Sequence, residues 1–454
     1  MAIETINPTT GNIEKTFKPT SSTQIEKKLS HAAKAFPLWS QLPIAKRITY
    51  IKKLTSSLEK NKESLAKLIT LEMGRIYTDA LAEIGKCIAI GTFYIHNSER
   101  ILSEQHIPTE AAKSYVRYDA LGVILGIMPW NYPFMLSLRS IIPALIAGNV
   151  FVLKHASNVP QCALALENIF AEIGFPNGVF TNLLIEGGKV TPLIEDDRIA
   201  AVTITGSETV GALVAEQAGK QLKKTVLELG GSDAFIVLED ADIKETVKQA
   251  VKGRHTNAGQ ACNSPKRFIL SHNIAKEFTT LFVEESKKLI VGDPFDEKTN
   301  VGPLAGEKIR EEIHRQVTQS VSKGARILHG GKKHPGAGFF YEVTVVDQVK
   351  KGMPLFDEEI FGPVSSLITV KTDEEAIKIA NDTHLGLSAS IWTKDIKRAH
   401  KFINNLHVGV VFVNQVVRSD PRLPFGGVKK SGYGRELGEF GIKEFTNIKT
   451  VVIK

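Results

Sequence analysis

Apolar side chains in the first hundred residues recur at three- and four-residue spacing, which is the period of an α-helix buried on one face. This pattern predicts helices over residues 23–39, 43–61 and 62–72. From residue 114 it changes to alternation and then to a continuously apolar run, SYVRYDALGVILGI (114–127), which we interpret as a hairpin leading into a buried strand. A helix-forming run over 137–149 follows it.

Further along the chain, short apolar runs alternate with segments of helical length. The runs predicted as strands are 149–155, 180–187, 199–207 and 225–231, followed by 234–240, 266–270, 325–331, 341–347, 364–370 and 409–414. The helices expected with them cover 159–174, 208–220, 242–258, 273–290 and 373–381. Strands that alternate with helices of this length indicate βαβ units and therefore parallel sheets. The final run, TVVIK at 450–454, is interpreted as an edge or intersubunit strand.

Composition and charge limit the class of protein. A chain of 454 residues exceeds what one hydrophobic core supports, so two or three domains are expected. The net charge is +8, but the lysines are scattered without a basic stripe or aromatic platform, which argues against nucleic acid. The N-terminus is polar, and the longest apolar stretch, 121–128, is too short to span a membrane. Three cysteines without CxxC spacing fit a reducing compartment, so a cytoplasmic protein is expected.

Cys262 is the first candidate for chemistry. It lies in GQACNSPKR (259–267), a polar stretch between a predicted helix and a predicted strand, beside small residues that leave its sulfur accessible. Free cysteines are usually buried and inert, and the helix-like surroundings of Cys87 and Cys162 fit that interpretation. A nucleophilic cysteine must be reachable and must lose its proton, which cationic or hydrogen-bonding surroundings promote.

Glu228 and Asn131 are candidate partners of this cysteine. Glu228 stands inside the apolar strand VLELGG, where burial should raise its pKa and suit it to accept a proton from water. The alternative is a strand-end glutamate paired with a lysine. Asn131, in MPWNYPF, can donate to a developing oxyanion or can simply cap the following helix. His255 is the nearest histidine in sequence, but its spatial partners cannot be inferred from the sequence.

A possible phosphate-binding turn lies at Gly206 and Ser207. No G-x-G-x-x-G follows a predicted strand, so the usual dinucleotide fingerprint is missing. TITGSETVG instead places these two residues where a strand becomes a helix N-terminus, whose free N–H groups and dipole favour an anion such as a pyrophosphate. Any strand–glycine–helix turn looks similar, so this motif alone does not establish a cofactor site.

The motifs stand in one order along the chain: MPWNYPF, TGS, LELGGSD, GQACNSPKR, EEIFGPV and PFGGVKKSGYGRE. This set resembles the aldehyde dehydrogenase superfamily over essentially the whole chain. LKHASNV, VLELGGSD, AGQACNSPKRF and FGGVKKSGYGREL further resemble its bacterial succinate-semialdehyde dehydrogenase branch. The resemblance implies an α/β fold with a Rossmann-type cofactor domain (1–106 and 121–227), an α/β catalytic domain (228–433) and a small β oligomerisation element (107–120 and 434–454). It also implies a homodimer or homotetramer.

The resemblance assigns roles to individual residues. Cys262 stands at the nucleophile, Glu228 at the base that activates water, and Asn131 at the oxyanion donor. The implied cofactor-binding positions are Trp130, Lys154, Ser157, Gly206, Ser207, Leu229, Glu359 and Phe361. Ser157 stands where NAD-selective relatives often carry a glutamate that repels a 2′-phosphate, so NADP is expected to be accepted alongside NAD. No metal site is expected.

Arg139 and Ser419 stand where relatives that accept apolar aldehydes carry aromatic residues. An arginine and a small hydroxyl can bind the carboxylate at the far end of a short aldehyde, so succinate semialdehyde is the expected substrate. Arg418 is a second candidate for the same carboxylate. Two alternatives stay open: Arg139 makes an ordinary ion pair, or the substrate is glutarate semialdehyde or a medium-chain aldehyde. A cysteine hydrolase would leave the cofactor motifs unexplained, and a non-catalytic relative would leave the intact catalytic set unexplained.

Overall fold

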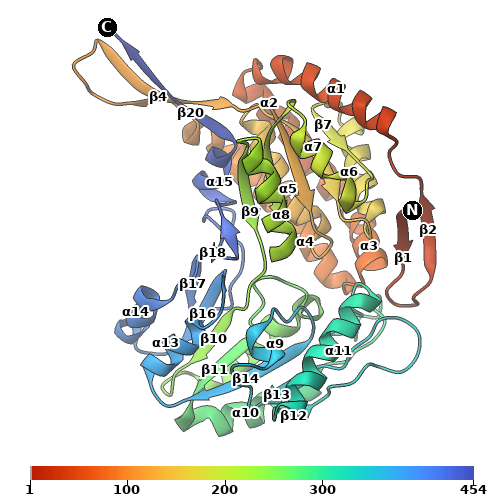
Figure 1. Cartoon of the computed structure of the whole chain (residues 1–454), viewed down its shortest axis with the longest axis vertical. Helices are drawn as coiled ribbons and strands as arrows, with labels where there is room; N and C mark the ends of the chain where they lie inside the picture. Colours follow the sequence, from red (N-terminus) through yellow and green to blue (C-terminus); the bar gives the residue numbers. More distant parts are fainter. Residues whose placement is uncertain (1–2) are drawn as a thin grey trace.

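Four helices dominate the first hundred residues of the computed structural model, which describes residues 3–454 (Figure 1). A two-stranded antiparallel sheet, β1 (Ile3–Ile6) and β2 (Ile13–Phe17), precedes them. The helices are α1 (Ser22–Ser40), α2 (Ile44–Lys60), α3 (Lys62–Met73) and α4 (Tyr77–Ile101). A capping box between Ser21 and Gln24 starts α1, and Gly74, with a φ of 76°, ends α3. The three helices predicted up to residue 72 are confirmed.

The first large sheet has the strand order β7-β6-β5-β8-β9-β19. Its strands are β5 (Val123–Met128), β6 (Val150–His155), β7 (Phe180–Asn182), β8 (Ile199–Thr205), β9 (Lys224–Glu228) and β19 (Gly432–Tyr433). The connecting helices are α5 (Pro133–Ile146), α6 (Pro160–Glu172), η1 (Gly187–Lys189), α7 (Thr191–Glu195) and α8 (Glu208–Lys220). Only β19 pairs in the antiparallel sense. The parallel strands follow the chain order 3-2-1-4-5 that is typical of dinucleotide-binding folds, which confirms the expected Rossmann-type sheet.

The second large sheet has the strand order β12-β13-β14-β11-β10-β16-β17. Its strands are β10 (Ala234–Val237), β11 (Arg267–Ser271), β12 (Arg326–His329), β13 (Thr344–Asp347), β14 (Val364–Val370), β16 (Ser388–Trp392) and β17 (Val410–Val413). Its helices are α9 (Ile243–His255), η2 (Thr256–Gly259), α10 (His272–Lys287), α11 (Glu307–Ser322), α12 (Pro354–Asp357), α13 (Asp373–Asn381) and α14 (Ile396–Asn405). Strand β12 alone is antiparallel to its neighbour.

Both faces of the second sheet are covered by helices. Phe235 and Val237 on β10 pack in one cluster with apolar residues of α9 and α10. Ala234 and Ile236, on the opposite face of the same strand, pack with apolar residues of α13 and α14. Successive side chains of a strand point to opposite faces, so a strand buried on both sides must be apolar throughout. This explains why AFIV was recognisable as a strand in the sequence.

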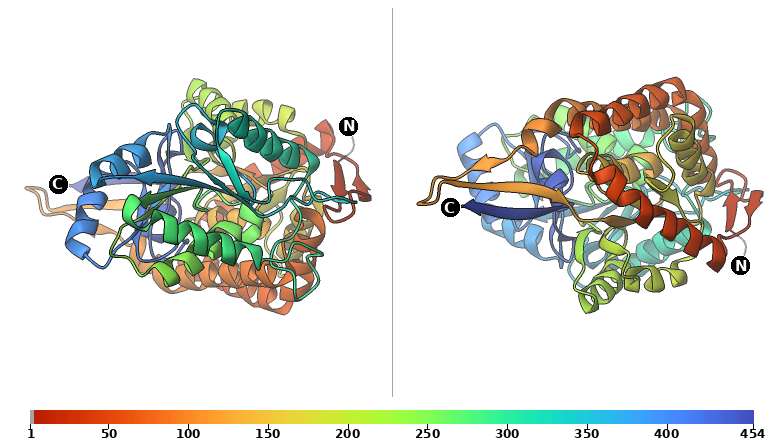
Figure 2. Two further views of the ribbon diagram at one scale, coloured as in Figure 1. Left: turned by 90° about the horizontal axis from the view of Figure 1, so that it is seen from below. Right: turned by 90° about the horizontal axis from the view of Figure 1, so that it is seen from above.

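A three-stranded antiparallel sheet, formed by β3 (Gln105–His106), β4 (Lys113–Ala120) and β20 (Thr446–Ile453), projects from the body as an arm (Figures 1 and 2). Strand β20 pairs with β4 along its whole length and is an edge strand, as predicted. The hairpin predicted over 114–127 is wrong in its pairing. The chain turns at Gly122, which has a φ of 146°, so that β4 pairs in the arm while β5 enters the first large sheet.

Residues 229–233 join the two large sheets. They run from the carboxyl end of β9 to the amino end of β10, so the carboxyl edge of one sheet is connected directly to the amino edge of the other. The remaining elements are α15 (Gly438–Glu444) and the small antiparallel pair β15 (Leu385–Gly386) and β18 (Val428–Lys429). Helix α15 packs against α5, which returns the end of the chain to the first sheet.

Candidate active site

A cavity of about 580 Å³ is lined by residues from elements of both large sheets. It brings together five side chains that the sequence offered from separate motifs. They are Asn131, Arg139, Cys262, Arg418 and Ser419. The cavity therefore joins a candidate nucleophile and oxyanion donor to the residues predicted to bind a distal carboxylate.

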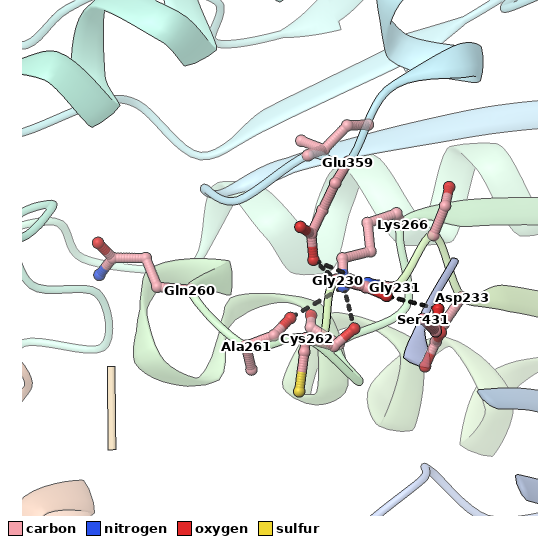
Figure 3. Close-up of polar contacts among 12 residues, drawn as sticks. Gly230, Gly231, Asp233, Gln260, Ala261, Cys262, Lys266, Glu359 and Ser431 are labelled. Carbon is pink, nitrogen blue, oxygen red and sulfur yellow. Dashed lines mark hydrogen bonds and ion pairs between the residues drawn. The ribbon is translucent and has the colours of Figure 1, made fainter. Parts of the chain in front are cut away.

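Cys262 is half-buried at this cavity, on the loop between η2 and β11. The fully buried Lys266 donates through Nζ to the carbonyl oxygens of Ala261, at 2.9 Å, and of Cys262 (Figure 3). Burial raises the pKa of the Cys262 thiol to about 12, while the charges of Lys266 and Arg139 act in the opposite direction. In the absence of ligands the thiol is therefore protonated at neutral pH.

Asn131 lies between β5 and α5 and is 5% exposed. Its side-chain Nδ2 donates to the carbonyl oxygen of Gln260 at 3.1 Å, two residues before Cys262. The alternative role as a helix cap is wrong, because the residue at the N-cap of α5 is Tyr132, and the first N–H groups of α5 are bound by the Glu83 carboxylate. Among the hydrogen bonds found for residues 3–454, none involves the backbone N–H of Cys262 as donor. This N–H and the Asn131 amide can both serve an oxyanion.

Glu228 ends β9 and is 3% exposed. The alternative that it pairs with a lysine is not what the structure shows, because its charged neighbours are Glu436, Arg139 and Arg435. Its Oε1 has no hydrogen-bond partner among the described residues. Burial raises the pKa of the Glu228 carboxyl well above its ordinary value, the negative charge of Glu436 adds to this, and Arg139 opposes it. The charge of Arg139 acts on both Glu228 and Cys262, and Glu228 is not among the residues that line the cavity beside Cys262.

The Arg139 guanidinium is 2% exposed and forms an ion pair with Glu436, near the Phe425 ring at 5.2 Å. The ion-pair alternative is therefore realised, between α5 and the segment before α15. The pairing leaves donors free, because Arg139 Nε has no hydrogen-bond partner among the residues described. Ser419 and the exposed Arg418 follow β17 and line the same cavity.

The predicted cofactor residues gather at the carboxyl edge of the first sheet and the facing segment of the second. Trp130 follows β5, Lys154 lies in β6, and Gly206 follows β8. Cofactors in open parallel sheets bind at this edge, where the strand order reverses between β5 and β8. Phe361 lies between α12 and β14 of the second sheet, and its ring meets the Trp130 ring edge-on, with the ring centroids 5.6 Å apart.

Two of these residues already have partners inside the protein. The Ser207 hydroxyl caps α8 by accepting from the Val210 N–H at 3.4 Å, so it acts at least as a helix cap. Glu359 Oε1 accepts from the Gly231 N–H at 3.0 Å and lies 3.8 Å from Lys266 Nζ (Figure 3). A Cβ on Gly230 would lie 2.5 Å from the Glu359 carboxylate, so only glycine permits this approach.

The remaining predicted positions fit a dinucleotide site. Lys154 is 8% exposed and buried surroundings lower its pKa, while Ser157 lies exposed three residues further on. Leu229, 6% exposed, packs on Gly211 of α8. A glycine turn at a helix N-terminus can receive a pyrophosphate, and Lys154 places a basic side chain at the same edge of the sheet.

The comparisons with known proteins agree with this geometry. The model of the aldehyde dehydrogenase family matches residues 1–451. The chain belongs to the aldehyde dehydrogenase family.

Curated relatives of this aldehyde dehydrogenase cover its full length. A probable NADP⁺-dependent succinate-semialdehyde dehydrogenase of Synechocystis sp. is 47% identical over 453 residues, which is 100% of both chains. An NADP⁺-dependent succinate-semialdehyde dehydrogenase of Mycobacterium tuberculosis is 45% identical over 458 residues, again 100% of both. The crystal structure of succinic semialdehyde dehydrogenase from Streptococcus pyogenes with NADP⁺ superposes with a TM-score of 0.97 at 35% identity, covering 100% of both chains.

The other cysteines and the nearest histidine have no part in the site. Cys87 and Cys162 are both 0% exposed, as the core interpretation predicted. His255 is 3% exposed and does not line the cavity, and burial lowers its pKa to about 3, so the ring is neutral. The residues lining the cavity include no histidine, which leaves a cysteine-hydrolase pair without its base.

Three residues of the aldehyde dehydrogenase site were not found from the sequence. Lys266 organises the Cys262 loop, and Arg75 and Asn257 contact the backbone of Asn131. Lys266 follows Cys262 closely, so its basic charge was a usable signal, whereas Arg75 and Asn257 carry no local signature.

No helix among residues 3–454 is long and apolar enough to cross a membrane.

Proposed function

We propose that this aldehyde dehydrogenase oxidises succinate semialdehyde to succinate with NADP⁺ as the hydride acceptor. The observation that carries the proposal is the single cavity that joins Cys262 and Asn131 to Arg139, Ser419 and Arg418. A reacting aldehyde carbon at Cys262 can thus extend toward cationic side chains that suit its distal carboxylate. The names of the relatives from Synechocystis and Mycobacterium tuberculosis support the same substrate and cofactor.

Cys262 and Asn131, which line the cavity, and Glu228, which ends β9, divide the chemistry into two halves. In the first, Cys262 loses its thiol proton to solvent, the thiolate attacks the aldehyde carbon, and the Asn131 amide and the Cys262 N–H hold the oxyanion. Collapse of the oxyanion expels a hydride, for which bound NADP⁺ is the acceptor, and leaves a thioester on Cys262. In the second half, Glu228 takes a proton from water, the hydroxide adds to the thioester, and the Cys262 thiolate leaves as the acid is released.

Substrate preference tests this proposal. We expect kcat/KM for succinate semialdehyde to exceed that for butanal by at least about 100-fold, because the two differ in the carboxylate that Arg139 and Ser419 can bind. Arg139→Lys keeps a charge for Glu436 but loses the planar fork, so KM for succinate semialdehyde should rise about 10- to 100-fold while butanal kinetics change little. Steady-state NADPH formation measures both.

Arg418→Ala is the matched comparison for this experiment, because Arg418 lines the same cavity but is exposed. If Arg418→Ala raises KM for succinate semialdehyde more than Arg139→Lys does, the substrate carboxylate binds Arg418 instead. Equal losses of kcat/KM for succinate semialdehyde and butanal in both variants would refute a carboxylate-binding cavity. A higher kcat/KM for glutarate semialdehyde would show that the substrate is one carbon longer than succinate semialdehyde.

Cofactor preference depends on Ser157. The residue is exposed after β6, three positions beyond Lys154, where a carboxylate would face a 2′-phosphate. Ser157→Glu should therefore lower kcat/KM for NADP⁺ by about 100-fold and leave NAD⁺ nearly unchanged, since only the phosphate is repelled. Ser157→Gln is the neutral control of similar size. Similar NADP⁺ kinetics in the glutamate and glutamine variants would contradict the assignment.

The same proposal assigns a separate role to each of three sheets. We assign the first large sheet with the N-terminal helices to cofactor binding, the second to catalysis, and the arm of β3, β4 and β20 to assembly of a cytoplasmic homodimer or homotetramer. Ile448, Val452 and Ile453 on β20 are between 47% and 62% exposed, and an edge strand with such side chains is suited to pairing with another subunit.

A further inference from the structure

A buried polar network fixes the backbone of Asn131 from two sides. The Asn131 carbonyl oxygen accepts from Arg75 Nη2 at 3.2 Å and from Asn257 Nδ2 at 3.1 Å. Arg75 and Asn257 also contact each other, because Arg75 Nε donates to Asn257 Oδ1 at 3.0 Å. All three residues are at most 5% exposed. Three segments far apart in the sequence therefore meet at one carbonyl group.

The same network holds the loop that carries Cys262. Asn257 Nδ2 donates to the Gln260 carbonyl at 3.0 Å, and the Asn131 amide donates to that carbonyl at 3.1 Å. The Gln260 side chain donates back to the Asn257 carbonyl at 3.2 Å and accepts from the Ala305 N–H at 2.9 Å. One asparagine thus links the oxyanion donor and the nucleophile loop.

Glu83 orients Arg75 and ties it to α5. Its carboxylate forms an ion pair with Arg75, with side-chain exposures of 1% and 0%, and Oε1 accepts from the N–H groups of Phe134 and Met135 at 2.9 and 3.0 Å. The Arg75 guanidinium also lies 3.7 Å above the Tyr132 ring. Each of the three guanidinium nitrogens donates one hydrogen bond and the guanidinium lies over the Tyr132 ring, which together favour one orientation.

The loop that the network holds is conformationally strained. Asn257 and Ala258 have φ values of 56° and 52°, and Gly259 follows with 72°. Consecutive left-handed residues that are not glycine persist only where surrounding contacts impose them. The Asn257 side chain supplies such contacts on both sides of the turn.

We propose that Arg75, oriented by Glu83, and Asn257 are positioning residues that set the Asn131 amide relative to Cys262, so that both can contact one oxyanion. Neither residue lines the cavity, and both act through Asn131 and the Gln260 carbonyl. The inference rests on the proposed function, because it requires Asn131 to be the oxyanion donor. Misplacing a catalytic group by about 1 Å can lower a rate about 100-fold, so a defined separation matters.

Arg75→Lys tests this inference in the full-length enzyme. Lysine keeps a charge for Glu83 but cannot reach Asn131 and Asn257 together, so the single-turnover rate of NADPH formation should fall about 10- to 100-fold with little change in KM. The matched control is Arg47→Lys, because Arg47 is also buried and donates only to backbone carbonyls, those of Ile146, Ser40 and Leu42. That variant should stay within about threefold of the wild type.

A double-mutant cycle with Asn131→Ala separates positioning from general destabilisation. Asn131→Ala alone should lower the rate about 100- to 1,000-fold, and adding Arg75→Lys should cost at most about twofold more, because the amide to be positioned is gone. Asn257→Gly, which tolerates the left-handed backbone, should behave like Arg75→Lys. Alkylation of Cys262 by iodoacetamide, a displacement that forms no oxyanion, should be unchanged in Arg75→Lys, which keeps the Asn257 side chain and its hydrogen bond to the Gln260 carbonyl.

The possible outcomes are distinct. If Arg75→Lys loses no more activity than Arg47→Lys, or if its loss multiplies in full with that of Asn131→Ala, the positioning role is refuted. If Asn131→Ala itself keeps the wild-type rate, the oxyanion step of the proposed function fails, and the positioning role fails with it. The inference is supported if Arg75→Lys lowers the rate in the enzyme that keeps Asn131, adds little to Asn131→Ala, and leaves the alkylation of Cys262 intact.

Discussion

Cys262→Ser is expected to lower kcat for NADPH formation by at least about 10,000-fold. A hydroxyl is a far weaker nucleophile than a thiolate unless a base activates it, and the residues lining the cavity include no histidine. The loss should appear with succinate semialdehyde and with butanal alike, because it affects the reacting atom and not the recognition of the carboxylate. Absorbance of NADPH in steady-state assays measures it.

Cys162→Ser provides the matched control for this change. Cys162 is 0% exposed and its side chain has Glu72 as a hydrogen-bond partner, which a serine hydroxyl can also use. This variant should keep kcat within about twofold, as a buried substitution that leaves the site intact. A Cys262→Ser enzyme that retained a tenth of the activity would contradict the covalent mechanism.

The high pKa of the Cys262 thiol adds a pH dependence to this result. Burial raises that pKa to about 12 in the ligand-free protein, so the thiolate fraction grows with pH throughout the neutral range. Alkylation of ligand-free enzyme by iodoacetamide should therefore accelerate about tenfold per pH unit between about pH 7 and pH 10. A rate that levels off near neutral pH would show that the thiol is already ionised.

Glu228→Gln is expected to separate the two halves of the reaction. The variant should still release about one NADPH per active site in a rapid first turnover, because thioester formation does not use this carboxylate. Its steady-state kcat should fall about 100- to 1,000-fold, because water then attacks the thioester without a base. Stopped-flow measurement of the burst and of the following steady rate checks both, and a variant without a burst would contradict the assignment of Glu228 to hydrolysis.

The ionisation of Glu228 also sets the direction of the pH profile. Burial and the charge of Glu436 raise the pKa of this carboxyl, and a base acts only when it is deprotonated. Steady-state kcat of the wild type should therefore rise as the pH rises through this pKa. The kcat of Glu228→Gln should not show this rise. A wild-type kcat that falls over the same range would show that the carboxyl acts as an acid.

Sequence periodicity predicted the strands that are buried on both faces, and it missed a helix whose burial is slight. Strands such as β5 and β6 are buried at every position, so they read as unbroken apolar runs. Helix α11 was not predicted, since only four of its 16 residues are buried: Ile313, Gln316, Val317 and Ser320. Strand β7 ends at Asn182, five residues before the predicted end, because an apolar stretch alone does not show where pairing stops.

The candidate site was predictable as far as its chemistry is local in sequence. Cys262, Asn131 and Glu228 each stand in a short motif whose residue types suggest a role, and Cys262 and Asn131 meet at one cavity. Partners at long range were not predictable. Glu436 is the ion-pair partner of Arg139 from the opposite end of the chain, and Asn257 contacts Arg75 across 182 positions. Such contacts depend on how the sheets pack, which periodicity does not encode.

The five residues 229–233 that join β9 to β10 constrain how this enzyme can be recombined with its relatives. Glu228 belongs to the first sheet by its strand, while a Cβ at Gly231 would lie 2.5 Å from the carbonyl oxygen of Cys262. The Leu229 N–H is held by the Ser431 carbonyl at 3.0 Å, and β19 completes the first sheet from near the end of the chain. A chimaera that exchanges cofactor specificity must therefore carry three pieces from one parent: the first sheet, the linker and the strand at residues 432–433. A single crossover point between β10 and β17 would separate β19 from the other strands of the first sheet.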